Sequence, residues 1–106
     1  MEHVAIGSLQ RSEAAPRLAT FAESGYPGFE VTTWWGILVP VRTPAAVVAR
    51  LNGELNRTLE DATVRSRMLT HGATIRTGTP EQQTELIVSE IEKWAKAVKA
   101  TGARVD

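Results

Sequence analysis

The sequence contains no cysteine, and this absence removes several kinds of chemistry at once. Disulfide bonds, thiolate nucleophiles and cysteine-type zinc sites are excluded, while the redox compartment is left open. Histidine is also scarce, because only His3 and His71 are present and they lack the spacing of two ligands on one helix. A metal site needs three or four convergent ligands. We therefore predict no metal site and no cofactor.

Nothing in the sequence predicts an enzyme. Ser8, His71 and an aspartate can be assembled on paper into a catalytic triad, but the chain has no Gly-x-Ser-x-Gly elbow. Ser8 lies at the end of a short strand-like stretch, which is not the strained turn that such a nucleophile requires. We expect no catalytic residues.

Net charge is absent as well, since 12 basic residues balance 12 acidic ones. Such a chain has no overall attraction for nucleic acid or for an anionic membrane. A small basic cluster is interpreted as a solvated face because no aromatic residue interleaves it; it consists of Arg65, Arg67, His71 and Arg76. The Gly25-Tyr26-Pro27-Gly28 outline of a nucleic-acid clamp precedes an expected strand instead of joining two helices. No nucleic-acid partner is predicted.

Long hydrophobic runs are missing too. No stretch approaches the roughly 20 apolar residues of a membrane span. The N-terminal residues include the acidic Glu2 and only a short apolar run, whereas a signal peptide needs a basic start and about 7 to 15 apolar residues. As written, the chain carries no export signal, which predicts a cytoplasmic location if the chain is complete.

The most distinctive stretch that is present is Glu30–Pro40, which is rich in β-branched and aromatic residues. It predicts a central strand, with Gly36 marking a bulge, a bend or a close backbone approach. Successive tryptophans, Trp34 and Trp35, would point to opposite faces of a sheet. Either indole can cap a core or line a ligand pocket.

Around this strand the sequence predicts three helices. The first is expected to begin at Thr43-Pro44, with the Thr43 hydroxyl as its cap and Pro44 at the first helical position. It carries an apolar stripe, Val47, Val48, Leu51, Leu55 and Leu59. Asp61 is expected to cap a second, shorter helix that ends at Gly72. The third begins with the capping box Thr79-Pro80-Glu81-Gln82 and ends at Gly102.

Shorter elements are predicted before the first helix and between the second and the third. Val4–Ile6 and Thr74-Ile75 are expected as short strands, and residues 17–24 as a short helix that Gly25 ends.

The order of motifs along the chain is more specific than any single motif. The matching pieces are Phe21-Ala22-Glu23-Ser24-Gly25-Tyr26-Pro27-Gly28-Phe29-Glu30-Val31, Trp34-Trp35-Gly36, Thr43-Pro44, Val48-Ala49-Arg50-Leu51-Asn52, Asn56, Gly78-Thr79-Pro80-Glu81 and Glu90-Ile91-Glu92-Lys93-Trp94. As an ordered string they resemble the C-terminal third of the Bug-type receptors. These are the extracytoplasmic solute-binding proteins of tripartite tricarboxylate transporters.

The resemblance implies an α/β fold, namely a partial lobe of a type II periplasmic-binding-protein fold with few strands covered by three helices. Residues 1–29 would be a remnant of the second lobe, with a strand, a short helix and a turn. Residues 30–106 would be the C-terminal part of the first lobe, with the crossing strand and the three helices. The implied location is periplasmic.

The implied function is that of a fragment of a receptor that binds small carboxylates and delivers them to the membrane subunits of a transporter. Thr33 and Trp34 are the positions implied as ligand contacts. Much of a receptor's length is absent from this chain, so weak or no binding by the fragment itself is expected. The alternative is a small self-associating interaction module. In either case the expected strand would lack neighbours, which predicts a homo-oligomer formed through it.

Overall fold

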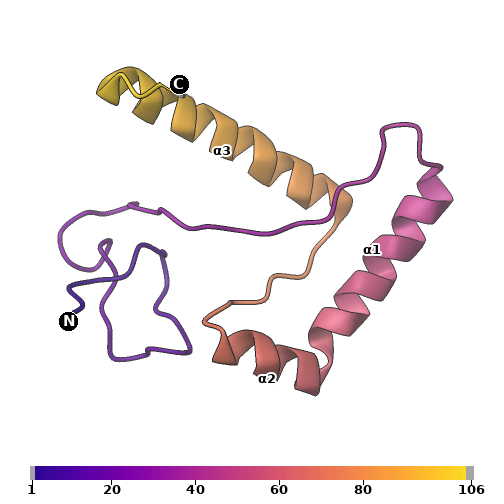
Figure 1. The fold of residues 1–106 in the computed structure, drawn as a ribbon, viewed down its shortest axis with the longest axis horizontal. Helices are drawn as coiled ribbons and strands as arrows, with labels where there is room; N and C mark the ends of the chain where they lie inside the picture. Colours follow the sequence, from indigo (N-terminus) through magenta and orange to yellow (C-terminus); the bar gives the residue numbers. More distant parts are fainter. Residues whose placement is uncertain (1, 105–106) are drawn as a thin grey trace.

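Three helices form where the apolar periodicity predicts them. The computed structural model describes residues 2–104, and within that range the helices are α1 (Ala45–Glu60), α2 (Ala62–Thr70) and α3 (Pro80–Thr101). Figure 1 shows α1 and α2 meeting at a corner, while α3 lies beside a long extended segment that precedes α1. The three helices therefore do not pack side by side as a bundle.

Two of the three predicted N-terminal caps are confirmed. Asp61 accepts hydrogen bonds from the backbone N–H groups of Thr63 and Val64 at 3.0 and 3.1 Å. At α3 the Thr79 hydroxyl accepts from the Gln82 N–H at 3.2 Å, and the Gln82 side chain accepts from the Thr79 N–H at 2.9 Å. These are the reciprocal bonds of a capping box.

The expected cap of α1 is wrong by one position. Pro44 is the residue that precedes α1, and no side chain caps this end of the helix. The Thr43 N–H instead closes a turn by donating to the Pro40 carbonyl at 3.0 Å. Because that turn occupies Thr43, the first helical residue is Ala45.

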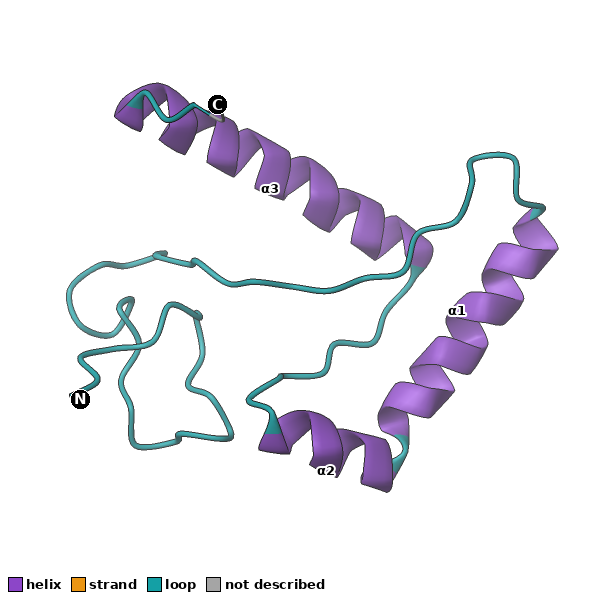
Figure 2. Ribbon diagram, viewed as in Figure 1, coloured by secondary structure: helices purple, strands orange, loops and turns teal. Residues whose placement is uncertain are grey.

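The predicted strands do not form a sheet. In Figure 2 the part of the chain between residues 2 and 104 contains helices and connecting segments, with no strand arrow. Glu30–Pro40 is extended and lies beside α3, but within residues 2–104 no backbone group of residues 32–39 pairs with another segment, and strand structure requires a paired backbone. Thr74-Ile75 belongs to the connection between α2 and α3. The Val4–Ile6 stretch makes only an isolated parallel bridge, between Ile6 and Thr20.

That bridge is the centre of a small backbone-paired region. The Ile6 N–H donates to the Ala19 carbonyl at 2.9 Å, and the Phe21 N–H donates to the Ile6 carbonyl at 3.0 Å. On the other side, the Val31 N–H donates to the Gly7 carbonyl at 2.8 Å. A Cβ on Gly7 would lie 2.5 Å from the Val31 oxygen, so this approach requires glycine. Three segments thus meet over a few residues only.

The helix expected at residues 17–24 is replaced by a single turn. Thr20 and Glu23 form reciprocal bonds, since the Glu23 carboxylate accepts from the Thr20 N–H at 2.9 Å and the Thr20 hydroxyl accepts from the Glu23 N–H at 3.1 Å. This is the geometry of a helix start, but Gly25 has a φ of 106° and stops the helix after one turn. Arg11 pairs with the same carboxylate at 2.9 Å, which ties the preceding loop to the turn.

The structure has almost no buried interior. Between residues 2 and 104 no hydrophobic side chain is buried, and Thr20 is the one buried residue. The radius of gyration is 16.8 Å, whereas a compact domain of this length has a radius of about 13 Å. The apolar stripes of the helices are therefore open on one side.

Two asparagines link α1 to the start of α3. The side-chain N–H groups of Asn52 and Asn56 donate to the Gly78 carbonyl at 2.9 and 2.8 Å, and the Gly78 N–H donates to the Asn56 side-chain oxygen at 3.2 Å. Asn56 therefore satisfies both backbone groups of Gly78, as a paired strand would.

We expect Asn56→Ala to lower the free energy of unfolding by about 1–3 kcal/mol, because it leaves the partly buried N–H of Gly78 without its partner. Urea titration followed by circular dichroism measures the change. Arg57→Ala is the matched control, since Arg57 makes only an exposed pair with Glu54 and should cost no more than about 0.5 kcal/mol. Equal effects of the two variants would contradict a structural role for the asparagine pair.

The N-terminal turn should be sensitive to acid. Hydrogen bonding by Arg11 and the Thr20 N–H lowers the pKa of Glu23 from 4.5 to about 2. The ionised carboxylate therefore stabilises the turn above pH 4.5, and this stabilisation is lost as the pH falls from 4.5 toward 2. NMR titration of the Glu23 carboxyl should show the low pKa in the native chain and a clear rise in Arg11→Ala. Arg17→Ala, at an exposed arginine in the same loop, should leave it low.

Candidate functional site

The extended segment at residues 30–40 runs antiparallel to α3 and lies close to it at its start and at its middle. Near the start, the Lys93 side chain donates to the Glu30 carbonyl at 2.9 Å. Near the middle, Gly36 lies against α3, where a Cβ would be 2.8 Å from the Gln83 side-chain nitrogen. This side-chain nitrogen is buried and makes no hydrogen bond within residues 2–104. The absence of a side chain at Gly36 therefore allows the close approach that the sequence predicted.

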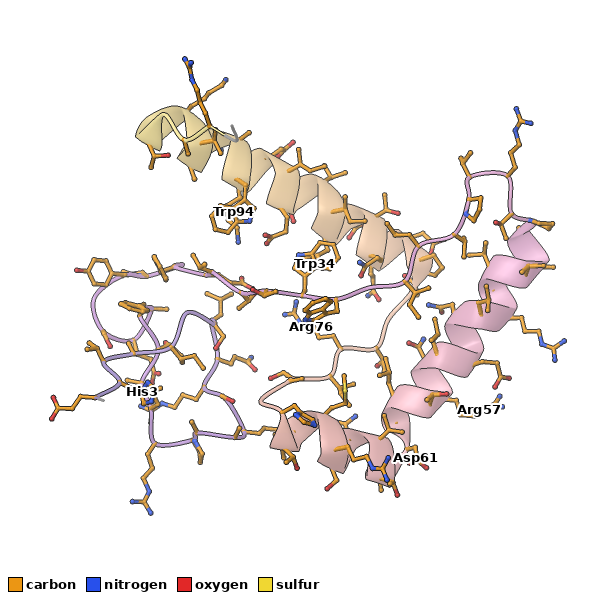
Figure 3. All side chains as sticks on the ribbon, viewed as in Figure 1. His3, Trp34, Arg57, Asp61, Arg76 and Trp94 are labelled. Atoms are coloured by element: carbon orange, nitrogen blue, oxygen red, sulfur yellow. The ribbon has the colours of Figure 1, made fainter. Side chains whose placement is uncertain are left out.

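Between these two points lies an open groove with a volume of about 430 Å³. Its lining comes from the extended segment and from one face of α3, and the residues are Thr32, Thr33, Trp34, Ile87, Glu90, Ile91 and Trp94. Figure 3 shows Trp34 directed from the segment toward α3 and Trp94 directed from α3 toward the segment. We call this hollow the indole groove.

The predicted alternation of the two neighbouring indoles is confirmed. Trp34 lies in the indole groove and is 39% exposed, whereas Trp35 is 93% exposed. An extended backbone sends successive side chains to opposite sides, which accounts for the difference. The segment therefore keeps strand geometry although it has no strand partner.

Glu90 is the charged group of the indole groove. Its carboxylate accepts hydrogen bonds from the Trp94 indole N–H at 2.8 Å and forms an ion pair with Lys93 at 2.9 Å. The hydrogen bond from Lys93, followed by that from Trp94, holds the pKa of the Glu90 carboxyl below its ordinary value. Glu90 is therefore ionised at neutral pH, and its side chain is only 13% exposed.

Lys93 serves three groups at once. Besides the Glu90 carboxylate and the Glu30 carbonyl, its ammonium lies 5.8 Å from the ring centroid of Trp94. A cation at this distance from an indole face is attracted to it. Its hydrogen-bonding capacity is largely committed, so Lys93 positions the groove instead of offering a free positive charge.

The structure brings Thr33 and Trp34, the predicted contact positions, into one groove. It adds Glu90 and Trp94, which the sequence analysis named only as part of the matching piece Glu90-Ile91-Glu92-Lys93-Trp94. Their spacing of four residues, with Lys93 between them, was visible in the sequence as a possible contact on one helix face. What the sequence did not show was that residues 32–34 lie opposite that face.

The chemistry of the indole groove is that of an apolar slot with one fixed carboxylate. Its lining contains no arginine or lysine. A ligand carboxylate placed beside Glu90 would be repelled, whereas apolar or hydrogen-donating groups would be accepted there. The hydroxyls of Thr32 and Thr33 are the remaining polar groups of the lining.

A second, smaller hollow of about 230 Å³ lies between the N-terminal loop and α2. Its lining includes Glu13 and Arg65, which have opposite charges, together with Ser66, Leu69, Ala73, Thr74 and Ile75. Of the predicted basic cluster, only Arg65 contributes to it.

Within residues 2–104 no three side chains of the metal-ligating types come close enough to hold an ion. No helix in that range has the length and apolarity needed to cross a membrane.

Comparison with known proteins decides the family. The family model for the tripartite tricarboxylate transporter family receptor matches residues 1–103. The chain belongs to this receptor family. The resemblance inferred from the ordered motifs is thereby confirmed.

Individual receptors agree with this assignment. BugT of Bordetella pertussis is 33% identical over 113 aligned residues, which cover 99% of this chain and 35% of BugT. A protein encoded in the tcbD-tcbE intergenic region of Pseudomonas sp. strain P51 is 39% identical over 94 residues, covering 88% of this chain and 28% of that protein. The chain thus spans about a third of the length of these relatives. The matching family is one of receptors and not of enzymes, in agreement with the prediction.

Solved structures of the family share the fold. The periplasmic binding protein BugD is 37% identical, with a TM-score of 0.75 over 92% of this chain and 33% of BugD. The R. palustris protein Rpa4515, solved with adipate, is 28% identical, with a TM-score of 0.77 and the same coverage of 92% and 33%. The predicted fold class, part of a lobe of a periplasmic-binding-protein fold, is confirmed at this level, although the predicted strands are not formed.

We expect Lys93→Met in this family member to raise the pKa of Glu90 toward its ordinary value and to loosen residues 30–34 from α3, because the variant removes the donor that serves both. Carboxyl NMR titration reports the first effect, and the loss of NOE contacts between Trp34 and the α3 side of the groove reports the second. Lys96→Met, on the same helix, should change neither. An unchanged pKa of Glu90 in Lys93→Met would mean that the Trp94 hydrogen bond alone controls it.

Proposed function

We propose that the chain is the C-terminal portion of a solute-binding receptor for small carboxylates, which delivers its ligand to the membrane subunits of a tripartite tricarboxylate transporter. The observation that carries this proposal is the match of the receptor family model to residues 1–103. The adipate in the structure of the R. palustris relative supports a dicarboxylate as one ligand of this class. A periplasmic location follows from the same relationship.

The lobe assignment is part of the proposal. We place residues 1–29 at the end of the second lobe and residues 30–106 in the first lobe, with the extended segment crossing between them. The change of character at Glu30 supports this boundary, since residues 2–29 form loops tied by Arg11 and Glu23 and the segment beyond Glu30 lies along α3.

Within this receptor, Thr33 and Trp34 are proposed to contact the ligand from one side only. Both line the indole groove, where a threonine hydroxyl can donate a hydrogen bond and an indole can cover the apolar carbons of a dicarboxylate. The positive charge that a carboxylate requires is missing from the groove lining. It must come from the other parts of a full receptor, and we therefore propose weak or no binding by this portion alone.

Self-association is a second proposal, and it rests on a different observation. The extended segment leaves Trp35, Ile37 and Leu38 at least 66% exposed. An apolar face of this kind is typical of an interaction surface. We propose that the chain forms a homo-oligomer through this segment, which would also serve the alternative function of a small interaction module.

A chimera tests the receptor proposal. Residues 1–103 of this chain replace the matching third of the R. palustris protein, and adipate binding is measured by calorimetry for the chimera and for the unaltered protein. We expect the chimera to bind adipate or another small dicarboxylate, and the isolated chain to give no measurable heat. A chimera that folds but binds no member of a mono-, di- and tricarboxylate panel would overturn the proposal.

A single substitution tests the proposal that Trp34 contacts the ligand. In the chimera, Trp34→Ala should weaken binding at least about tenfold, because loss of a contact worth about 1.4 kcal/mol corresponds to that factor. Ile91→Ala, on the α3 side of the same groove, is the matched control for loss of apolar packing. If both variants reduce the affinity equally, Trp34 supports the fold and does not touch the ligand.

A further inference from the structure

We propose that the peptide between Glu30 and Val31 is the pivot between the two lobes, and that Lys93 is the positioning residue that holds this pivot to the first lobe. This assignment rests on the lobes proposed above and adds the group about which they turn. Two hydrogen bonds on opposite sides of one peptide plane support it.

The peptide between Glu30 and Val31 is bonded on both of its sides. Its carbonyl oxygen accepts from the Lys93 ammonium at 2.9 Å, and its N–H donates to the Gly7 carbonyl at 2.8 Å. The peptide is trans, so these two groups point in opposite directions. Figure 1 accordingly shows the N-terminal loops and α3 on opposite sides of the extended segment. One peptide therefore joins the two parts of the chain.

The N-terminal loops, residues 2–29, form a unit that has few other links. The ring centroids of Phe29 and Phe21 lie 5.0 Å apart, and the Phe29 N–H donates to the Tyr26 carbonyl at 3.0 Å. Within residues 2–104, the bond from Val31 to Gly7 is the one hydrogen bond between this N-terminal unit and the remaining residues. The unit can therefore turn about this peptide without breaking any other hydrogen bond to the rest.

The two bonds of the peptide differ in how far they can adjust. On one side the backbones touch, because a Cβ on Gly7 would lie 2.5 Å from the Val31 oxygen. On the other side the Lys93 ammonium ends a flexible stem and carries three N–H donors, so it can follow a carbonyl that moves. Its ion pair with Glu90 at 2.9 Å keeps it close to α3. The peptide thus moves with the N-terminal unit, and Lys93 limits how far.

This limit bears on ligand binding by a two-lobed receptor. The apparent affinity of a ligand falls with the fraction of the protein that is in the binding-competent conformation. Lys93 does not line the indole groove, so its effect on binding comes through the range of lobe orientations that it permits. The ion pair with Glu90, which does line the groove, connects the pivot to the groove through one side chain.

Pulsed EPR distances test the pivot in the chain itself, which has no cysteine that would interfere with labelling. Spin labels are attached at Arg17→Cys in the N-terminal unit and at Lys99→Cys on α3, both at exposed positions. We expect a narrow distance distribution in the otherwise native chain and a broad one in Lys93→Met. Lys96→Met, on the same helix, is the matched control and should stay narrow. A broad distribution in the native chain, or a narrow one in Lys93→Met, would overturn the proposal.

A substitution at Gly7 tests the other side of the peptide. Gly7→Ala should shift the mean distance between the same labels, because the added Cβ displaces the Val31 carbonyl. Gly53→Ala is the control, since the Cβ it adds would meet open space. Helices α1, α2 and α3 begin after residue 44, so circular dichroism shows whether they are intact in each variant. An unchanged distance in Gly7→Ala would mean that the peptide does not move with the N-terminal unit, which contradicts the pivot.

A different anchor for the N-terminal unit would be the smaller hollow, where Glu13 of its loop and Arg65 of α2 share a lining. No ion pair joins these two side chains within residues 2–104. Arg65→Ala should therefore leave the label distances narrow. Broadening in Arg65→Ala without broadening in Lys93→Met would place the anchor at that hollow instead of at the peptide.

The chimera with the R. palustris protein shows whether the pivot matters for binding. Lys93→Met should weaken adipate binding at least about fivefold, the lower end of typical coupling between sites, because fewer lobe orientations are competent to bind. Lys93→Arg keeps a cation with N–H donors and should retain most of the affinity. Glu90→Gln removes the charge in the groove but leaves the bond from Lys93 to the main chain, so it should keep the label distances narrow.

Unchanged adipate affinity in the Lys93→Met chimera would overturn the role of Lys93 in the receptor. A chimera that binds no carboxylate would instead overturn the receptor proposal. The label distances are measured without any ligand, so the pivot and the receptor proposal fail separately.

Discussion

The position of the extended segment depends on one ammonium group. Lys93 holds the Glu30 carbonyl, neutralises Glu90 and lies near the ring of Trp94, so the start of the segment, the charge of the groove and one of its indole walls are set by a single side chain. A lysine stem is flexible, and an ion pair close to the surface contributes little stability by itself. Here the ion pair also fixes the position of the main chain, because the same ammonium group donates to the Glu30 carbonyl.

Polar contacts connect the helices and loops of this chain, whereas in most domains a buried apolar core connects them. The asparagine pair on Gly78 connects α1 to α3, Arg11 and Glu23 close the N-terminal turn, and no hydrophobic side chain of residues 2–104 is buried. A typical hydrogen bond adds only about 0.5–1.5 kcal/mol, so a few such links define an arrangement without making it rigid. The open apolar stripes fit a chain that spans about a third of its relatives, in which the same elements belong to a larger lobe.

Local signals in the sequence were sufficient for the helices and insufficient for the sheet. The capping box at Thr79, the aspartate cap at Asp61 and the left-handed Gly102 are each decided by neighbouring residues, so they could be predicted. A strand depends on a partner distant in sequence, and the propensity of Glu30–Pro40 gave the extended shape but not the partner. Family resemblance named Thr33 and Trp34 as ligand contacts, and the structure shows that both line the groove. Glu90 and Lys93 were missed as its electrostatic centre because their role arises only when residues 30–34 cross α3.

The uncharged run from Val31 to Val39 bears on how readily the purified chain aggregates. A segment of high β-propensity without proline or charge is the kind that stacks into cross-β fibrils, and here its indole at position 35 is 93% exposed. Glu30 and Arg42 then act as gatekeepers, since stacking many copies in parallel register would align columns of like charge. Fibril growth would accordingly be slowest at low ionic strength, where such columns repel most strongly.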